Sequence, residues 1–308
     1  MTENFLMVSQ QVIILFILIG IGFVCGKSKF LNDNAPAKLT DIVLYIVTPC
    51  VMINAFQRKF DAAMLLNLGI TALCSVAIII GSIIICNIIF RDKNISRNKV
   101  LKFGTVFSNC GFMSLPLQSA ILGTDGVFYG SVFVAVFNII IWTYGLYAMS
   151  GNKKELSIKK LALNPGILGV IIGLILFLLS ITLPNVISTP VEYLANLNTP
   201  VPMIIIGYHL SQSKLKEIFK DKWAYVSIGM RLILIPVLSL TIMYLCGIRG
   251  DILVACTIAS AAPVAATTTM FATKFKADVK LSVGIVSATT LISIITMPLI
   301  ISVATMIA

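Results

Sequence analysis

Ten apolar runs of about 20 residues dominate this sequence. A run of about that length, coiled as an α-helix that rises 1.5 Å per residue, crosses the roughly 30 Å hydrocarbon core of a bilayer. Hydrophobic residues make up 58% of the 308 residues and charged residues only 11%, too few to cover a soluble domain of this size. Because strand-like alternation is absent, we expect an all-α integral membrane protein with ten transmembrane helices. The runs cover approximately residues 5–25, 39–56, 64–90, 100–122, 127–149, 165–183, 191–210, 223–246, 252–273 and 281–307.

The basic residues mark one side of the membrane. Nineteen of the 23 Lys and Arg residues fall in the odd-numbered loops between the runs, and the even-numbered loops hold only Arg58, Lys59 and Arg249. By the positive-inside rule the odd-numbered loops are cytoplasmic. This predicts a multi-pass protein of the plasma membrane with both termini on the outer side. The net charge of +11 then reflects orientation in the membrane, and nucleic acid is not an expected partner.

A six-residue signature occurs twice, 151 positions apart. The same offset places residues 109–111 opposite residues 260–262, and both neighbourhoods interrupt an apolar run. Five runs per half is an odd number, so the two copies must enter the membrane from opposite sides as inverted repeats. We expect residues 1–308 to form one membrane unit with five-helix repeats at 1–150 and 163–308. The two copies read Thr48-Pro49-Cys50-Val51-Met52-Ile53 and Thr199-Pro200-Val201-Pro202-Met203-Ile204.

The fourth and ninth runs are interrupted near their middles by small, polar and proline residues. Proline removes a backbone donor and glycine relaxes the backbone, so Gly111, Pro116 and Pro263 are expected to break these helices. If the broken helices cross, their half-helix amino ends direct positive dipoles at a central cavity, which suits a carboxylate. The predicted substrate-binding residues of these two runs are Asn109, Gly111, Ser260, Pro263 and Thr267.

Pro49 and Pro200 lie in the middle of the second and seventh runs and are expected to break their helices beside the same cavity. Helices that are merely kinked by proline, with polar residues that bond neighbouring helices, would give the same sequence pattern. Asn54 is a further polar candidate for the substrate site, and pairing with another helix is its alternative role.

Arg231 is a basic residue deep inside a run. It lies roughly 12 Å along a helix from Lys222 in the cytoplasmic loop. A charge at that depth either attracts the substrate, acts as a counter-ion, or extends its head to the cytoplasm.

The sequence contains no catalytic or cofactor motif. HExxH, GxSxG and GxxxxGK[ST] are missing, and the single histidine, His209, limits acid–base chemistry. The seven cysteines form no CxxC pair. We therefore expect no enzyme activity, no catalytic residue, no cofactor and no metal site.

The motifs of the fourth, ninth and tenth runs, in their order and spacing, resemble the auxin efflux carrier family over essentially the whole chain. The resemblance is to its bacterial members, malate or malonate permeases in particular. It implies a fold similar to that of sodium/proton antiporters and bile-acid symporters, in which a scaffold domain holds a transport domain with crossed fourth and ninth helices. The matching segments are Asn109-Cys110-Gly111-Phe112 with Leu115-Pro116, then Ala261-Ala262-Pro263, and Ile294-Ile295-Thr296-Met297-Pro298-Leu299.

The resemblance also implies organic-anion substrates, auxin in the plant members and dicarboxylates in the bacterial ones. The plant carriers have an Asn-Pro pair at each crossing. Here Cys110 follows Asn109, and the second crossing has Ser260 and Pro263 with no asparagine. This departure argues against auxin itself.

Together these features predict a secondary active transporter or facilitator that works by alternating access. The expected substrate is a small organic anion, either a mono- or dicarboxylate such as malate or malonate or an auxin-like acid, and the lipid bilayer is the other partner. Two alternatives stay open. One is a sodium- or proton-coupled symporter or exchanger of another solute on the same scaffold, and the other is a membrane sensor without flux. Proton or sodium coupling and a homodimer also stay open.

Overall fold

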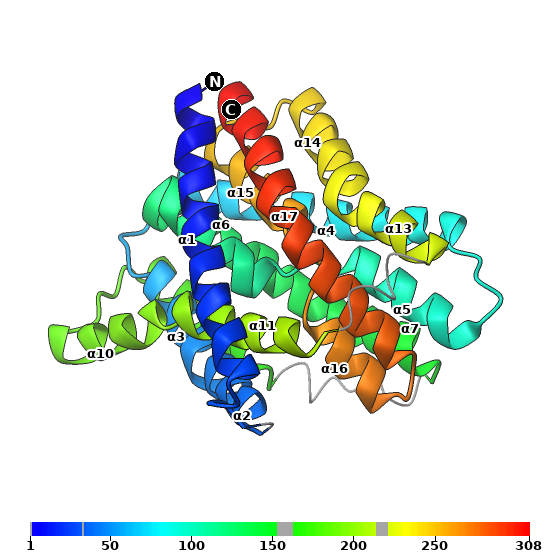
Figure 1. Cartoon of the computed structure of the whole chain (residues 1–308). Coiled ribbons are helices and arrows are strands. Elements are labelled where there is room, and N and C mark those ends of the chain that lie inside the picture. Colours follow the sequence, from blue (N-terminus) through cyan, green and yellow to red (C-terminus); the bar gives the residue numbers. More distant parts are fainter. Residues whose placement is uncertain (1, 33, 153–162, 214–220) are drawn as a thin grey trace.

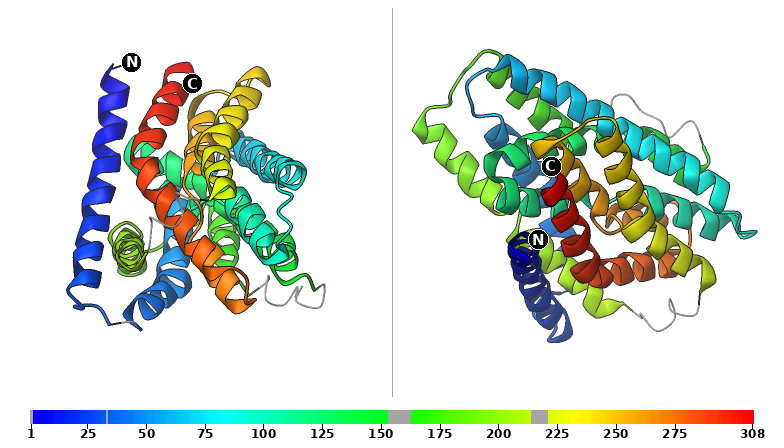
Figure 2. Two further views of the ribbon diagram at one scale, coloured as in Figure 1. Left: turned by 45° about the vertical axis from the view of Figure 1, so that its right-hand side comes forward. Right: turned by 90° about the horizontal axis from the view of Figure 1, so that it is seen from above.

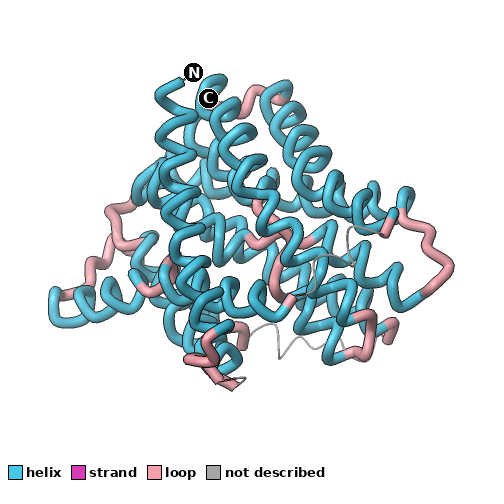
Figure 3. Tube along the Cα trace, viewed as in Figure 1, coloured by secondary structure: helices cyan, strands magenta, loops and turns pink. Residues whose placement is uncertain are grey.

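The computed structural model describes residues 2–32, 34–152, 163–213 and 221–308, and every regular element in these ranges is helical (Figures 1 and 3). Several lysines of the loops predicted to be cytoplasmic, and most of the predicted joint between the repeats, lie outside the described residues. The α-helices are α1 (Thr2–Lys27), α2 (Ala35–Ile42), α3 (Thr48–Ala55), α4 (Ala62–Ile89), α5 (Ile95–Val106), α6 (Leu115–Ile140), α7 (Leu146–Ser150), α9 (Pro165–Leu178), α10 (Asn185–Asn196), α11 (Pro200–Gln212), α13 (Lys222–Gly229), α14 (Ile235–Leu245), α15 (Gly250–Ala261), α16 (Thr267–Lys274) and α17 (Val279–Ile307). The π-helical turns are η1 (Val43–Val47), η2 (Cys110–Ser114), η3 (Ile141–Gly145) and η5 (Met230–Leu234).

Six helical segments of the described chain are long and apolar enough to cross a membrane. One of them, Cys110–Ser150, contains the second half of the fourth run and the whole fifth run. Between these two runs Gly123 turns the chain sharply inside α6, with φ 65° and ψ −144°. Only glycine adopts that conformation readily. The fourth, seventh and ninth runs are each divided between two helices, and the sixth is α9. The six segments are Phe5–Lys27, Ala35–Ala55, Ala62–Ile89, Cys110–Ser150, Lys222–Leu245 and Val279–Ile307.

Three prolines inside apolar segments continue their helices. Pro49, Pro116 and Pro236 each stand second in an α-helix that directly follows a five-residue π-helical turn. The wider turn accommodates the proline ring, which would clash with the preceding turn of a regular α-helix. Pro49 therefore lies within the continuous segment Ala35–Ala55. Pro200 differs, because it begins α11 after a break that follows α10.

Helices α1 and α11 pack backbone to backbone beside the rest of the bundle (Figures 1 and 2). A Cβ atom on Gly22 would collide with the carbonyl oxygen of Ile204, and one on Gly207 would collide with that of Ile19. Small residues at such contacts are typical of helix pairs in membranes, where close van der Waals packing replaces the hydrophobic effect. Figures 1 and 2 also show the N and C termini at the same end of the molecule.

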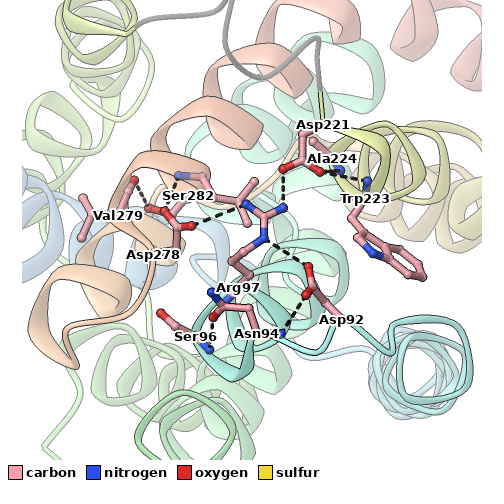
Figure 4. Close-up of polar contacts among 11 residues, drawn as sticks. Asp92, Asn94, Ser96, Arg97, Asp221, Trp223, Ala224, Asp278, Val279 and Ser282 are labelled. Atoms are coloured by element: carbon pink, nitrogen blue, oxygen red, sulfur yellow. Dashed lines mark hydrogen bonds and ion pairs between the residues drawn. The ribbon is translucent and has the colours of Figure 1, made fainter.

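One arginine links the amino ends of three helices on the side of the odd-numbered loops. Figure 4 shows Arg97, in the first turn of α5, among three aspartates. Its Nε donates to Asp92 at 3.1 Å, its Nη2 donates to Asp221, and its Nη1 lies 3.7 Å from Asp278. Asp221 and Asp278 also cap α13 and α17 by accepting backbone N–H bonds. The cluster holds α5, α13 and α17 together.

The charges of this cluster shift the pKa values of its members. Burial, the largest single influence on Asp221, would raise its pKa, but hydrogen bonds from Arg97 and from the backbone N–H of Ala224 and Trp223 lower it below the ordinary 3.8. The hydrogen bond to Asp221 is the main cause that raises the pKa of Arg97. A carboxyl whose pKa is lower in the folded state stabilises the fold above its ordinary pKa and loses that effect as the pH falls below it.

We therefore expect Asp221→Asn to lower the melting temperature of the purified protein at pH 7, with a difference from the native protein that shrinks as the pH falls below about 4. Asparagine keeps the capping oxygen, so the substitution removes the charge and leaves the cap. Thermal unfolding followed by the fluorescence of the two tryptophans measures the effect. An equal difference at pH 3 and pH 7 would show that the ion pair is not responsible.

Candidate functional site

The breaks of the fourth and ninth runs contact each other. Helix α5 ends at Val106 and the next helical turn begins at Cys110, while α15 ends at Ala261 and α16 begins at Thr267. Between them Ser108 and Val264 form an antiparallel bridge. We call this pair of extended segments, residues 107–109 and 262–266, the crossover.

Backbone groups of the two segments satisfy one another. The N–H of Asn109 donates to the carbonyl of Pro263 at 2.7 Å, and the N–H of Ala265 donates to the carbonyl of Phe107 at 2.9 Å. In addition, the N–H of Val264 donates to the hydroxyl of Thr289 on α17 at 3.2 Å. Broken helices leave polar backbone groups without intrahelical partners, and a bilayer supplies none. The crossover resolves this problem by pairing one break with the other.

Arg231 joins the carboxyl ends of the two helices that lead into the crossover. It is 1% exposed and lies in η5, where its Nη1 donates to the carbonyls of Thr105 and Val106 at 3.2 Å each. Its Nη2 donates to the carbonyl of Ser260. These carbonyls belong to the last turns of α5 and α15, each with roughly half a negative charge from the helix dipole. The single positive charge of the guanidinium therefore roughly offsets the negative charge of both helix ends.

The helices that leave the crossover present their amino ends there. The turn η2 leads into α6, and α16 begins at Thr267, so both ends carry a partial positive charge. Three buried hydroxyls near these ends, those of Ser114, Thr267 and Thr268, have no hydrogen-bond partner within the described chain. Buried polar groups without partners are costly, and hydroxyls both donate and accept. The two amino ends thus combine positive potential with free hydrogen-bonding capacity.

Asn109 is the predicted site residue at the amino end of η2. It is 6% exposed, stands immediately before η2, and its side chain makes no capping bond to that turn. Gly111 lies within η2 with open space where a Cβ would be. Pro263 lies in the other crossover segment and accepts the backbone bond from Asn109. Thr267 begins α16.

Ser260 lies outside the crossover segments, in the last turn of α15. Its hydroxyl donates to the carbonyl of Thr257 at 3.0 Å, and its own carbonyl accepts from Arg231. The repeat offset places Asn109 opposite Ser260, but Ser108 pairs with Val264, several positions further along. The second helix therefore continues for about one turn beyond the point that the offset indicates. Proline 263 sets that end, because the residue before a proline disfavours helical geometry.

Two other predicted residues lie away from the crossover. Asn54 is in α3, which packs mainly against α9, α10 and α6. Pro116 follows η2 at the second position of α6, so the break occurs upstream of it, at Phe107–Asn109. Pro49 and Pro200 belong to the α3 and α11 segments described above.

The structure adds polar residues that the sequence reasoning did not select. Gln118 is fully buried, and its Nε2 donates to the carbonyl of Ala255 at 2.8 Å, which ties α6 to α15. The hydroxyls of Thr105 and Ser227 lie 2.7 Å apart and tie α5 to α13. An amide or hydroxyl in an apolar run is the signal that would have found them, although it does not tell which helix each one meets.

A second ion pair lies at the end of the molecule that holds the even-numbered loops. Nη1 of Arg58, between α3 and α4, is 2.6 Å from Oδ1 of Asp125 in α6, and the guanidinium lies 4.2 Å from the ring centroid of Phe128. The Phe128 ring packs against Phe56, which directly follows α3, at 4.9 Å and against Phe177 of α9 at 5.4 Å between centroids. We call these five side chains the outer contact. It joins α6 to α3 and α9.

Comparison with known proteins places the chain among membrane transporters. The family described as "Membrane transport protein" matches residues 7–301. An uncharacterized transporter of Methanocaldococcus jannaschii is 24% identical over 302 residues, which cover 94% of this chain and 96% of the relative. Another, of Methanothermobacter thermautotrophicus, is 21% identical over 295 residues, with the same coverage. The chain therefore belongs to the membrane transport protein family, the auxin efflux carrier family.

Proposed function

We propose that this protein transports a small organic anion, a mono- or dicarboxylate such as malate or malonate, across the plasma membrane by alternating access. The proposal includes ten membrane crossings in two inverted repeats, with the fourth and ninth helices broken at the crossover. Both termini are assigned to the outer side by the distribution of basic residues.

The contact of Arg231 with both incoming helix ends carries this proposal. Four half-helices meet at the crossover, and their dipoles alone would present positive and negative ends in equal number. Arg231 offsets the two negative ends at Thr105, Val106 and Ser260, whereas the two positive ends keep a combined charge of about +1. A carboxylate would complete this balance, with the amide of Asn109 as an uncharged donor before η2 and the hydroxyls of Thr267 and Thr268 at the amino end of α16.

The outer contact supports alternating access. It connects α6, which continues from the crossover, to α3 and α9, which pack against each other away from it. An ion pair and a ring cluster of this kind can separate and re-form as units. We propose that they close the outer path in this conformation and release when the crossover turns outward.

Counterflow in proteoliposomes tests the function directly. Vesicles loaded with unlabelled malate, malonate, succinate, citrate or indole-acetate are diluted into the matching labelled acid. Accumulation of one acid would establish transport together with its substrate class, and an imposed sodium or pH gradient would then test coupling. If none of the labelled acids accumulates although the protein is shown to be folded, the proposal is contradicted.

Replacement of Asn109 by Ala is expected to reduce counterflow about 10- to 100-fold, because a hydrogen bond to a charged group is worth about 1.5–3 kcal/mol. The protein should still fold, since the backbone bonds of Asn109 do not involve its side chain. Asn87→Ala in α4 is the matched control, because Asn87 is exposed and its side chain is bonded to Tyr144 at 3.4 Å, away from the crossover. Equal counterflow for the two variants would remove Asn109 from the site.

Substitutions of Arg231 separate its charge from its shape. Arg231→Gln removes the charge and leaves helix-end carbonyls short of donors, so we expect loss of transport and a stability loss of about 1–3 kcal/mol. Arg231→Lys keeps the charge but cannot reach both helix ends with a planar fork, so transport should persist with a raised KM. Counterflow rates at several substrate concentrations measure the difference. If the glutamine variant transports as well as the lysine variant, the charge balance is not what attracts the anion.

Loss of the Arg58–Asp125 pair is expected to shift the protein toward the outward-open conformation. Gly111→Cys places a thiol at a position with open space, and an impermeant maleimide added from outside reports its accessibility. In combination with Arg58→Gln this thiol should react about three to ten times faster, since the ion pair and the ring contact contribute on the order of 1 kcal/mol. The neighbouring Lys59→Gln is the control. Equal rates in both combinations would show that the pair does not close the outer path.

A further inference from the structure

An apolar groove lies between α4 and α14, away from the crossover. Its volume is about 490 Å³, and its walls include Ile70, Leu73 and Ile85 of α4 and Leu238 and Met243 of α14, with Ile248 of the following loop at one end. The two helices thus leave space between them along part of their length. A volume of this size is typical of sites that bind small molecules.

The polar side chains in the groove are already satisfied. The hydroxyl of Ser82 donates to the carbonyl of Ile78, and that of Ser239 donates to the carbonyl of Ile235, both at 2.7 Å within their own helices. With these donors already used, a polar solute would find few hydrogen-bond partners there and would lose its hydration, which costs free energy. An aliphatic chain makes no hydrogen bonds with water, so it gives up none when it enters the groove.

The length of the groove fits a lipid tail. Residues 70 to 85 of α4 extend over about 22 Å of helix, which exceeds the roughly 15 Å that half of the hydrocarbon core measures. The whole length of a lipid tail can therefore lie obliquely between the two helices.

A fixed cation stands next to the end of the groove. Arg249 follows Ile248 directly, and its Nη1 donates to the carbonyls of Tyr244 at 2.6 Å and Ile248 at 2.8 Å. Its guanidinium also lies 3.6 Å from the ring centroid of Tyr244. A guanidinium has five N–H donors, so these two bonds leave others for an anion, and phosphate is a favoured partner of arginine.

We propose that a phospholipid binds here, with one tail in the groove between α4 and α14 and its phosphate at Arg249. The apolar walls, the satisfied hydroxyls and the ordered guanidinium at one end together match this ligand. The proposal requires only that the chain lies in a membrane, and it does not depend on which solute is transported.

Glycine 81 offers a direct test, because it lines the groove and a Cβ added to it meets open space. Gly81→Phe should fill the groove without disturbing α4. Gly69→Phe is the matched control, since Gly69 lies on the same helix, has equally open space and is not part of the groove wall. Arg249→Gln tests the phosphate contact. Native mass spectrometry of the full-length protein with added phosphatidylglycerol, or with diacylglycerol of the same tails, measures the bound lipid.

We expect the native protein and Gly69→Phe to retain phosphatidylglycerol equally, Gly81→Phe to retain at least tenfold less, and Arg249→Gln to retain about three- to tenfold less. Retention of diacylglycerol should not change in Arg249→Gln. Undiminished retention in Gly81→Phe would overturn the site, and equal retention of both lipids by the native protein would overturn the phosphate contact. If Gly81→Phe instead abolished a dimer and left lipid retention unchanged, the groove would belong to a second copy of the chain and the proposal would fail.

Discussion

The rest of this structure depends on the need to satisfy backbone groups where two helices break inside an apolar bundle. A broken helix exposes carbonyls at one end and N–H groups at the other, and a bilayer offers no partner for either. Here the exposed groups are divided into three sets. The extended residues pair with each other through Asn109 and Pro263 and through Ala265 and Phe107, the incoming carbonyls accept from Arg231, and the outgoing amino ends keep their positive potential.

Polar side chains join one group of helices around the crossover. Arg231 follows α13 and contacts α5 and α15, while Arg97 joins the amino ends of α5, α13 and α17. Gln118 adds α6 to the same group. Helices α1 and α11 are held differently, by close glycine packing at Gly22 and Gly207. Polar clamps resist separation and glycine contacts permit sliding, so under the proposed function the clamped group is the part that would move as one body.

The sequence predicted the parts of this architecture that depend on local composition. The length of the apolar runs predicted an all-helical protein, and Pro263 with its small neighbours predicted a break in the ninth run, where α15 ends at Ala261 and α16 begins at Thr267. The position of the other break was less predictable, because the effect of Pro116 on its helix is absorbed by the π-helical turn before it. The partners of Arg231 could not be predicted from residue identities, since they are backbone carbonyls that any residue would supply. The contacts of Arg97 with three aspartates could not be predicted either, because each aspartate belongs to a different stretch of the chain.

The charge balance at the crossover also bears on how a substrate would be distinguished. Under the proposed function, the attraction for an anion would arise from helix ends and from one guanidinium held by carbonyls, so it would not require a cationic side chain in contact with the substrate. Direct contact with a lysine or arginine would bind many anions strongly and release them slowly. Partial charges spread over two helix ends attract more weakly, so recognition then depends on uncharged groups such as Asn109 and the hydroxyls of Thr267 and Thr268. Under the proposed function, the backbone would select for negative charge and these side chains would select among the acids that carry it.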